Sequence, residues 1–339
     1  MRKLLLLFVI SAVMGNFVVN LKQTNGAQHD QVKLKASFHY PPTHSAVVFA
    51  QKTFSKLEQL TEGRAKVEVY HSSTLCKPPE LWDALNRGIV DFSIMPLILF
   101  RSGPPWWGFE LLPTGQRSLY GMHQAAANGL LEIYQEGFHS MGLKITVPTI
   151  HCPGFSHFLT KGKRVAVPED MKGLKIQAAG PLEADIIKAV GATPVIMSHA
   201  DVYEALMTGL IDGTMGNISS IPQHNVQEPG EYICMQTLGG PYVGTLVSEV
   251  GLNRLSKVDR GIFIELVKNY AMRDELFFAL SNEEIFKKKV VPDMKEVVYP
   301  TPEQSKLWEE SFKPVIEKWQ SKAGEKGREA LSILLKYNN

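Results

Sequence analysis

The chain has 339 residues, 44% of them hydrophobic, and a formal net charge of +2 at pH 7. This apolar content is enough to fill one or two cores, and it excludes an intrinsically disordered chain. The charge is nearly balanced, and the sequence has no long run of Lys and Arg and no aromatic RNA-binding motif, so we expect no nucleic-acid partner.

The amino terminus predicts export. Two basic residues precede an apolar run from Leu4 to Val13, a length typical of the core of a signal peptide and short of the roughly 20 residues that span a bilayer. We therefore predict a signal peptide over residues 1–27, cleaved after Ala27, and a periplasmic mature protein. An uncleaved membrane anchor is the alternative, because Asn25 stands where a small residue is preferred.

The chain after residue 30 opens with a strand–helix–strand pattern. Alternation of apolar and polar residues predicts strands over Val32–Phe38 and Ala65–Val69, and an apolar helical face spans Ala46–Leu57 between them. This opening favours an open α/β domain, whose ligands bind beyond the carboxyl ends of the strands. The turn after the first strand therefore provides two candidate ligand contacts, Phe38 and His39.

The segment Gly103–Glu110 combines Gly and Pro with three aromatic residues. A loop of this composition can present flat apolar faces, which hold either an apolar ligand or a cation. Trp106, Trp107 and Phe109 are therefore candidate ligand contacts. The alternative is that these rings fill the core of the domain. The apolar pattern of residues 118–138 then predicts one helix, followed by a strand over Leu143–Val147.

One short pattern occurs twice. Asp83–Asp91 and Glu204–Asp212 each contain a helical segment, a terminating Gly, two apolar residues and an Asp. Ser198 and Asp201 are spaced like a capping box before the second helix, which should end at Gly209. Two copies about 120 residues apart predict two α/β lobes of similar construction rather than a solenoid of short repeats.

The last third of the chain predicts two strands and two long helices. Glu231–Met235 and Tyr242–Val250 are strand-like, and the apolar residues around Ile262–Val267 mark a helix. Thr301–Gln304 combines a capping box with Pro at the first helical position, so a second helix begins there. Its aromatic residues at helical spacing are expected to pack in the core; they are Trp308, Phe312 and Trp319.

Several of these segments resemble the solute-binding proteins of tripartite ATP-independent periplasmic (TRAP) transporters, of the dicarboxylate-binding type. The resemblance includes Thr61–Tyr70, both copies of the repeated pattern and Pro168–Ile176, and it covers nearly all of the chain after residue 30. It implies a two-lobed, class II periplasmic-binding-protein-like α/β fold with a ligand cleft between the lobes. It also implies a protein that captures a small organic solute and delivers it to a TRAP membrane permease, without a cofactor.

On this resemblance, lobe I consists of residues 30–150 with about 240–280, and lobe II of residues 151–239 with about 281–339. Polar residues of the family reach the cleft in segments that correspond here to Gly154–Phe158 and the stretch after Asp212-Gly213. The resemblance therefore suggests Ser156, His157 and Asn217 as ligand contacts. Asp212 is expected to hold the turn at the end of its strand instead, and Asp91 is expected to do the same in the first copy. That makes both aspartates structural.

Position 177 bears most directly on the solute. The family usually has Arg after Lys-Ile, and its planar fork suits a solute carboxylate, whereas this chain has Gln177. A neutral amide would leave a buried carboxylate poorly compensated. Two conclusions remain open: another cation, such as Arg101, Arg117 or His157, replaces the Arg, or the solute is not a typical carboxylate. A small amine, alcohol or aromatic compound would fit the aromatic loop.

Motifs for other chemistry are absent from the sequence, which has no GxxxxGK[ST], no GxGxxG, no GxSxG and no CxxC. We therefore expect no enzyme, no catalytic residue and no metal site, since His39 and His44 lack the spacing of a helical metal pair. The spacing of the three cysteines matches no zinc motif, which leaves idle thiols or one disulfide. A periplasmic sensor subunit that passes its closure to a receptor, or a periplasmic enzyme, are the alternatives to a transport protein.

Overall fold

The structure, a computed structural model, describes residues 31–100, 103–116 and 118–337. The predicted signal peptide over residues 1–27 lies outside this range, and so do Arg101 and Arg117. Within the described residues, no helix combines the length and the hydropathy that a membrane span requires.

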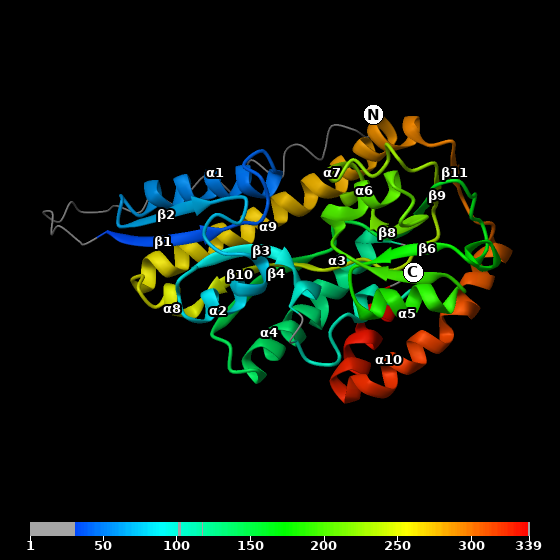
Figure 1. The fold of residues 1–339 in the computed structure, drawn as a ribbon. Coiled ribbons are helices and arrows are strands. Elements are labelled where there is room, and N and C mark those ends of the chain that lie inside the picture. Colours follow the sequence, from blue (N-terminus) through cyan, green and yellow to red (C-terminus); the bar gives the residue numbers. More distant parts are fainter. Residues whose placement is uncertain (1–30, 101–102, 117, 338–339) are drawn as a thin grey trace, which may run out of the picture. The chain divides into compact units, whose positions relative to one another are not determined.

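The first sheet contains five strands in the order β2-β1-β3-β10-β4 (Figure 1). β1 pairs in parallel with β2 and β3, whereas β10 runs antiparallel between β3 and β4. The strands that the alternating pattern predicted near the amino terminus are confirmed. The five strands are β1 (Val32–Ser37), β2 (Ala65–Tyr70), β3 (Phe92–Pro96), β4 (Ile145–His151) and β10 (Val243–Ser248).

The second sheet contains six strands in the order β11-β9-β5-β8-β6-β7. β6 lies parallel to β7 and β8, while β5 lies antiparallel to β8 and β9. Each sheet thus has a parallel group that begins with a strand–helix–strand unit, as the two-lobed α/β prediction requires. The six strands are β5 (Ser156–Thr160), β6 (Lys175–Ala178), β7 (Thr193–Ile196), β8 (Gly213–Asn217), β9 (Tyr232–Cys234) and β11 (Glu296–Val298).

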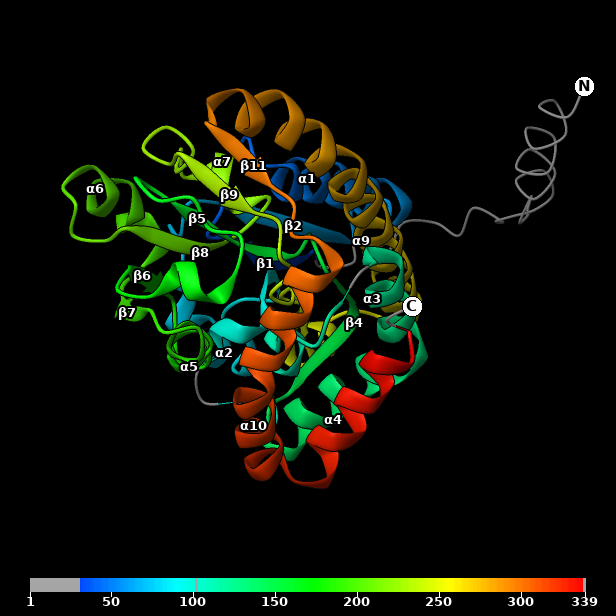
Figure 2. The same ribbon diagram turned by 90° about the vertical axis from the view of Figure 1, so that its right-hand side faces the viewer.

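Helices pack against both sheets (Figure 2). The C-terminal helix α10 contacts helices that belong to both halves of the molecule. It lies against α5 and, further along the chain, against α3 and the turn that follows α3. The division into lobes at the predicted boundaries therefore stays a prediction. The helices are α1 (Ser45–Leu60), α2 (Leu81–Asn86), α3 (Leu119–Ala125), α4 (Leu131–Ser140), α5 (Pro181–Ala189), α6 (Val202–Met207), α7 (Ser220–Gln223), α8 (Glu249–Leu252), α9 (Lys257–Ile285) and α10 (Pro302–Lys336).

The capping box at the start of α10 is confirmed. The Thr301 hydroxyl accepts a hydrogen bond from the backbone N–H of Gln304, and the Gln304 side chain accepts one from the backbone N–H of Thr301. The box predicted before α6 is only half present. Ser198 accepts from the backbone N–H of Ala200 and begins a single 3-10 turn, after which α6 starts at Val202.

The prediction of one helix over residues 118–138 is wrong. α3 and α4 are separate helices, because Asn128 and Gly129 between them have non-helical backbone angles. Gly129 has a φ of +128°, and a β-carbon at this position would lie 2.9 Å from the side chain of Ile333 in α10. The break therefore depends on a glycine conformation and a close tertiary contact. The apolar periodicity of residues 118–138 continues across the break, so this periodicity did not reveal where the helix is interrupted.

The two copies of the repeated pattern have the same backbone geometry. Asp91, directly before β3, donates its N–H to the carbonyl of Lys35 in β1 at 2.7 Å and accepts the Lys35 N–H on its carboxylate at 2.8 Å. Asp212, directly before β8, makes the same pair of bonds with Lys175 of β6 at 2.7 and 2.8 Å. This arrangement, the aspartate clamp, fixes each strand to its parallel neighbour. The structural role expected for both aspartates is confirmed.

The two clamps differ in their surroundings. Asp91 is 2% exposed, and its second carboxylate oxygen accepts from the guanidinium of Arg254. Gly251 of α8 approaches so closely that a β-carbon there would lie 2.2 Å from the same carboxylate. Asp212 is only partly buried. The carboxylate of the first clamp is therefore buried, whereas that of the second clamp is partly exposed to water.

We predict that Asp91→Ala lowers the free energy of unfolding by about 3 kcal/mol, because charge-assisted hydrogen bonds are lost in a buried place. Asp212→Ala should lower it by roughly half as much, since water replaces the lost bonds more easily. Urea denaturation of both variants measures the difference. Equal losses, or a larger loss for Asp212→Ala, would contradict this ranking.

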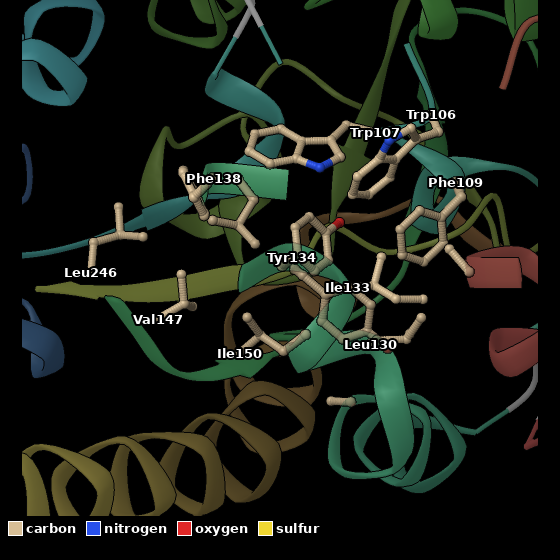
Figure 3. Packing of buried hydrophobic residues seen from close by; sticks show 14 of the residues in the cluster. Trp106, Trp107, Phe109, Leu130, Ile133, Tyr134, Phe138, Val147, Ile150 and Leu246 are labelled. Atoms are coloured by element: carbon tan, nitrogen blue, oxygen red, sulfur yellow. The ribbon is translucent and has the colours of Figure 1, made fainter. Parts of the chain in front are cut away.

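The aromatic loop fills the core beside the first sheet. The rings of Trp106, Trp107 and Phe109 gather around Tyr134 of α4 in Figure 3. The centroids of Trp107 and Phe138 are 5.0 Å apart and those of Phe109 and Tyr134 are 5.7 Å apart. Trp106 and Trp107 are each 8% exposed and Phe109 is fully buried. Most of the surface of these three rings therefore packs in the core, as the alternative interpretation of the loop predicted.

Glu110 follows these rings and carries a carboxyl group into the same core, where it is 1% exposed. Burial raises the pKa of Glu110 to about 7, and the neighbouring Tyr134 hydroxyl and backbone groups offset this effect only in part. The carboxyl is therefore neutral in mildly acidic solution. Above neutral pH the folded protein holds a charge in an apolar environment.

This burial predicts a pH dependence of stability. An unfolded Glu110 releases its proton near its ordinary pKa of 4.5, whereas the folded protein retains it up to about pH 7. The contribution of this group to stability therefore falls as the pH rises through this window, by about 3 kcal/mol in total. Glu110→Gln removes that dependence, so the variant should gain stability relative to the unmodified protein between pH 5 and pH 8. Urea denaturation at both pH values tests this, and an identical pH dependence of the two proteins would exclude it.

Candidate functional site

A cavity of about 760 Å³ lies where strand ends of the two sheets meet. The first sheet contributes the segments that follow β1, β3 and β4, and the second sheet contributes those that follow β6, β7 and β8. The volume suits a small organic molecule. The position agrees with the expectation that ligands of open α/β sheets bind beyond the carboxyl ends of the strands.

Four of the nine predicted site residues line this cavity. His39 follows β1, Trp107 belongs to the aromatic loop, Ser156 is the first residue of β5 and Asn217 is the last residue of β8. These residues are up to 178 positions apart in the sequence (39 to 217) and are brought together by the two sheets.

Ser156 and Asn217 differ in what their side chains already bond. Among the described residues, the Ser156 hydroxyl has no hydrogen-bond partner, although its backbone N–H donates to Gly239. Asn217 donates its amide to the carbonyl of Gly154 and accepts from the backbone N–H and hydroxyl of Ser219, at 2.9 and 2.7 Å. Ser156 therefore offers an available polar group, whereas Asn217 mainly holds the cavity wall in place.

The other five predicted residues lie outside the cavity lining. Phe38 is 1% exposed in the core of the first sheet, and Trp106 and Phe109 belong to the aromatic core. His157 points to the opposite face of β5 from its neighbour Ser156, and its Nδ1 lies 3.1 Å from the carbonyl of Gln236. Alternation along the strand thus gives the cavity one of these two neighbours and the core the other.

Gln177 also differs from the expectation. Its side chain is fully buried, donates from Nε2 to the carbonyl of Met197 at 3.0 Å and accepts at Oε1 from the hydroxyl of Thr214 at 2.6 Å. These bonds connect β6 to β8 and to the end of β7. The amide at this position therefore satisfies polar groups of the sheet, and it does not line the cavity in this structure.

The sequence analysis named one histidine of the cavity, His39, and missed four others. Five histidines line the cavity: two come from the loop between β1 and α1, and three come from other loops or strand ends. The ring of His44 stacks on that of Tyr40 with centroids 3.9 Å apart, and the ring of His39 is tilted against Tyr40 at 3.8 Å. Only His39 directly follows a predicted strand, so the sequence offered little signal for the other four. The five are His39, His44, His151, His199 and His224.

Four of these histidines do not replace the missing Arg as a cation at neutral pH. Burial lowers the pKa of His39 to about 4, helped by the nearby His44, and it lowers the pKa of His44 to about 4 as well. Burial also lowers the pKa values of His199 and His224. His157, named above as a substitute cation, has its pKa lowered to about 4 by burial, so it is neutral too.

The charges of the cavity are few. Among the described residues that line it there is no Lys and no Arg, and Glu183 at the start of α5 is the sole acidic residue. Burial raises the pKa of Glu183 to about 7. The cavity thus presents neutral donors and acceptors, aromatic faces and one carboxyl group.

The part of the chain that the structure describes contains no group of three or more His, Cys, Asp and Glu that could hold a metal ion. Within the same residues, no disulfide joins Cys76, Cys152 or Cys234 to another cysteine. Burial raises the pKa of the Cys234 thiol to about 11, so this group stays protonated.

Two α/β sheets that share one cavity at their strand ends define a class of binding proteins that enclose a small solute. Residues 37–323 match the model of the bacterial extracellular solute-binding protein family 7, and the chain belongs to this family. The resemblance to TRAP solute-binding proteins and the two-lobed α/β fold are thereby confirmed. The chain is a periplasmic solute-binding protein and not an enzyme.

Several characterised relatives are similar over most of their length. The chain is 26% identical over 326 residues to the C4-dicarboxylate-binding periplasmic protein of Rhodobacter capsulatus, which covers 93% of this chain and 95% of the relative. It is 29% identical over 297 residues to the ectoine-binding periplasmic protein of Halomonas elongata, which covers 84% and 83%. With a solute-binding protein of Roseobacter denitrificans, the match covers 66% of the relative, just under two thirds.

Solved structures agree with the fold at low identity. A TRAP periplasmic solute-binding protein from Ochrobactrum anthropi superposes with a TM-score of 0.81 at 18% identity, covering 91% of this chain and 96% of that one. Another from a Sulfitobacter species, with bound β-D-galacturonate, gives a TM-score of 0.79 at 20% identity, covering 90% and 99%. At this identity the comparison supports the architecture and carries no information about the solute of this chain.

We predict that Gln177→Leu destabilises the protein by about 1–3 kcal/mol, because the Thr214 hydroxyl and the Met197 carbonyl lose a buried partner. The double variant Gln177→Leu with Thr214→Val should recover part of this loss, since both polar partners of one bond are then removed. Urea denaturation of the two variants measures the coupling. A stability unchanged by Gln177→Leu would show that these bonds do not form in solution.

Proposed function

We propose that this protein captures one small organic solute in the cavity between the two sheets and delivers it to a TRAP-type membrane permease. The observation that carries the proposal is the origin of the lining, which comes from strand ends of both sheets. A solute that contacts both sides stabilises the form in which they are closed around it. The lobes that close are those predicted above, residues 30–150 with about 240–280 and residues 151–239 with about 281–339.

The proposed contacts come from both sides of the cavity. His39 and Trp107 belong to the first sheet and its loops, while Ser156 and Asn217 belong to the second. The ring face of Trp107 supplies apolar contact, and the available hydroxyl of Ser156 supplies one directional hydrogen bond. A pocket with a few polar groups among apolar walls orients a solute and distinguishes it from others of similar size.

The solute class follows from the charges. The named relatives include binding proteins for C4-dicarboxylates and for ectoine, and a solved relative holds succinate, so the family accepts organic acids and other compounds. This chain has Gln177 in place of the usual Arg, and its described lining has no Lys or Arg. We therefore favour a solute other than a simple dicarboxylate: an amine, a neutral molecule or an aromatic compound. An organic acid is the alternative, with Arg101, outside the described residues, as its partner.

Solute binding should appear directly in a thermal-shift screen of the purified protein over carboxylates, amines, polyols and aromatic compounds. A ligand at a hundredfold excess over its dissociation constant stabilises the folded state by about 2.7 kcal/mol, which shifts the melting temperature measurably. Native mass spectrometry of the same preparation identifies a solute retained from the cell. A screen in which no compound class raises the melting temperature would count against solute capture.

We predict that Ser156→Ala weakens binding of the solute found in this screen about three- to tenfold, because one neutral hydrogen bond contributes roughly 0.5–1.5 kcal/mol. The matched control is Ser321→Ala, which removes an exposed hydroxyl on α10. Titration calorimetry compares the two variants with the unmodified protein. Equal affinities of Ser156→Ala and Ser321→Ala would remove Ser156 from the contacts.

A further inference from the structure

We infer that Glu183 selects a positively charged nitrogen in the solute, so that the cavity takes an ammonium-bearing compound, either a cation or a zwitterion. The inference rests on the proposed function, because it assigns a ligand class to the same cavity.

The position of Glu183 is fixed by the start of a helix. Glu183 is the third residue of α5, and the three residues before it, Gly180, Pro181 and Leu182, also line the cavity. Its Oε2 accepts the backbone N–H of Ala179 at 2.5 Å. In the part of the chain that the structure describes, this carboxyl makes no other hydrogen bond and no ion pair. A carboxylate has about four acceptor positions, so most of its capacity faces the cavity unused.

Asp185, the other acidic residue of α5, has a cationic partner within the described part of the protein, unlike Glu183. Asp185 lies away from the cavity and pairs with Lys318 of α10 at 2.7 Å. The acid on the outer side of α5 therefore has a cationic partner within the protein. Glu183 has none among the described residues, since no Lys or Arg occurs in the described lining. Within the described part of the chain no cation is available to Glu183, so we assign this role to the solute.

The rest of the lining suits such a cation. Tyr40, Phe100 and Trp107 contribute aromatic rings to the same cavity, and aromatic faces attract alkylammonium groups. The ionised Glu183 would repel a carboxylate group of a solute. A zwitterion avoids this repulsion if its nitrogen lies toward Glu183 and its acidic end lies toward the neutral donors on the other side of the cavity.

The protonation of Glu183 links solute binding to proton release. Burial raises the pKa of this carboxyl to about 7, so in neutral solution a substantial fraction carries a proton. An ammonium group in contact with it favours the ionised form and lowers its pKa, which releases the proton on binding. Other titratable or charged groups of the cavity, of α5 and of the elements that pack on α5 include Tyr40, His39, His44, His151, His199, His224, Lys175, Asp185, Lys188 and, on α10, Lys313, Glu317, Lys318 and Lys322.

Titration calorimetry with matched probes tests the inference. The probes are choline, its uncharged isostere 3,3-dimethylbutan-1-ol, the zwitterion ectoine and the dicarboxylate succinate. We expect choline or ectoine to bind more tightly than the uncharged isostere and succinate. Glu183→Gln should weaken that binding at least tenfold, whereas the control Asp185→Asn, which neutralises the outward acid of the same helix, should leave it within twofold.

Proton release gives an independent readout. At pH 7, the binding enthalpy of the unmodified protein should differ between phosphate and Tris buffers, whose ionisation enthalpies differ, and Glu183→Gln should abolish that difference. Urea denaturation of both variants establishes that they are folded. Tighter binding of succinate or of the uncharged isostere, or an affinity for choline and ectoine unaffected by Glu183→Gln, overturns the inference and leaves solute capture standing. Failure of every compound class in the thermal-shift screen instead overturns solute capture itself.

Discussion

The aspartate clamp determines how both sheets present their strand ends. Asp91 and Asp212 each bind the backbone of a neighbouring parallel strand through one N–H and one carboxylate oxygen. Because the clamp ties the residue before one strand to the backbone of its parallel neighbour, it sets the register between the two strands. The carboxyl ends of the paired strands consequently open onto the same cavity. A short interaction at one edge of each sheet thus positions the solute site at the opposite edge.

The elements that the sequence predicted are those that depend on local pattern. The strands around Val32–Ser37 and Ala65–Tyr70, the repeated helices α2 and α6, and the cap at Thr301 are all encoded within a few consecutive residues. The break at Asn128 and Gly129 was missed although Asn-Gly is a local turn signal, because the apolar periodicity continues across it. The close contact of Gly129 with Ile333, some 200 residues further along the chain, could not be read from the local pattern. Periodicity reports which face of a segment is apolar, and it is silent about distant contacts.

The candidate site shows the same limit more strongly. Ser156 and His157 were equivalent from the sequence, and only the alternation of β5 decides which of them reaches the cavity. The resemblance directed attention to Gln177, yet its amide bonds with Thr214 and Met197 because both partners are offered by neighbouring strands. His39 was a candidate from the sequence, whereas the other four histidines of the cavity were overlooked because their positions converge only in three dimensions. Glu183 was missed for a different reason: a lone acid in the first turn of a helix ordinarily serves the helix itself.

The C-terminal helix gives the molecule a mechanical property. Val315 of α10 belongs to the core beside the second sheet, and Trp319, one helical turn later, belongs to the core beside the first. The same helix therefore contributes side chains to both cores. Pro314 lies directly before this turn and lacks the N–H that would complete the helical ladder. Gly324, with a φ of +65°, breaks the helix a second time within the part that packs in the first core. α10 is thus a jointed connector between the two cores, with one weakened turn at Pro314 and one break at Gly324.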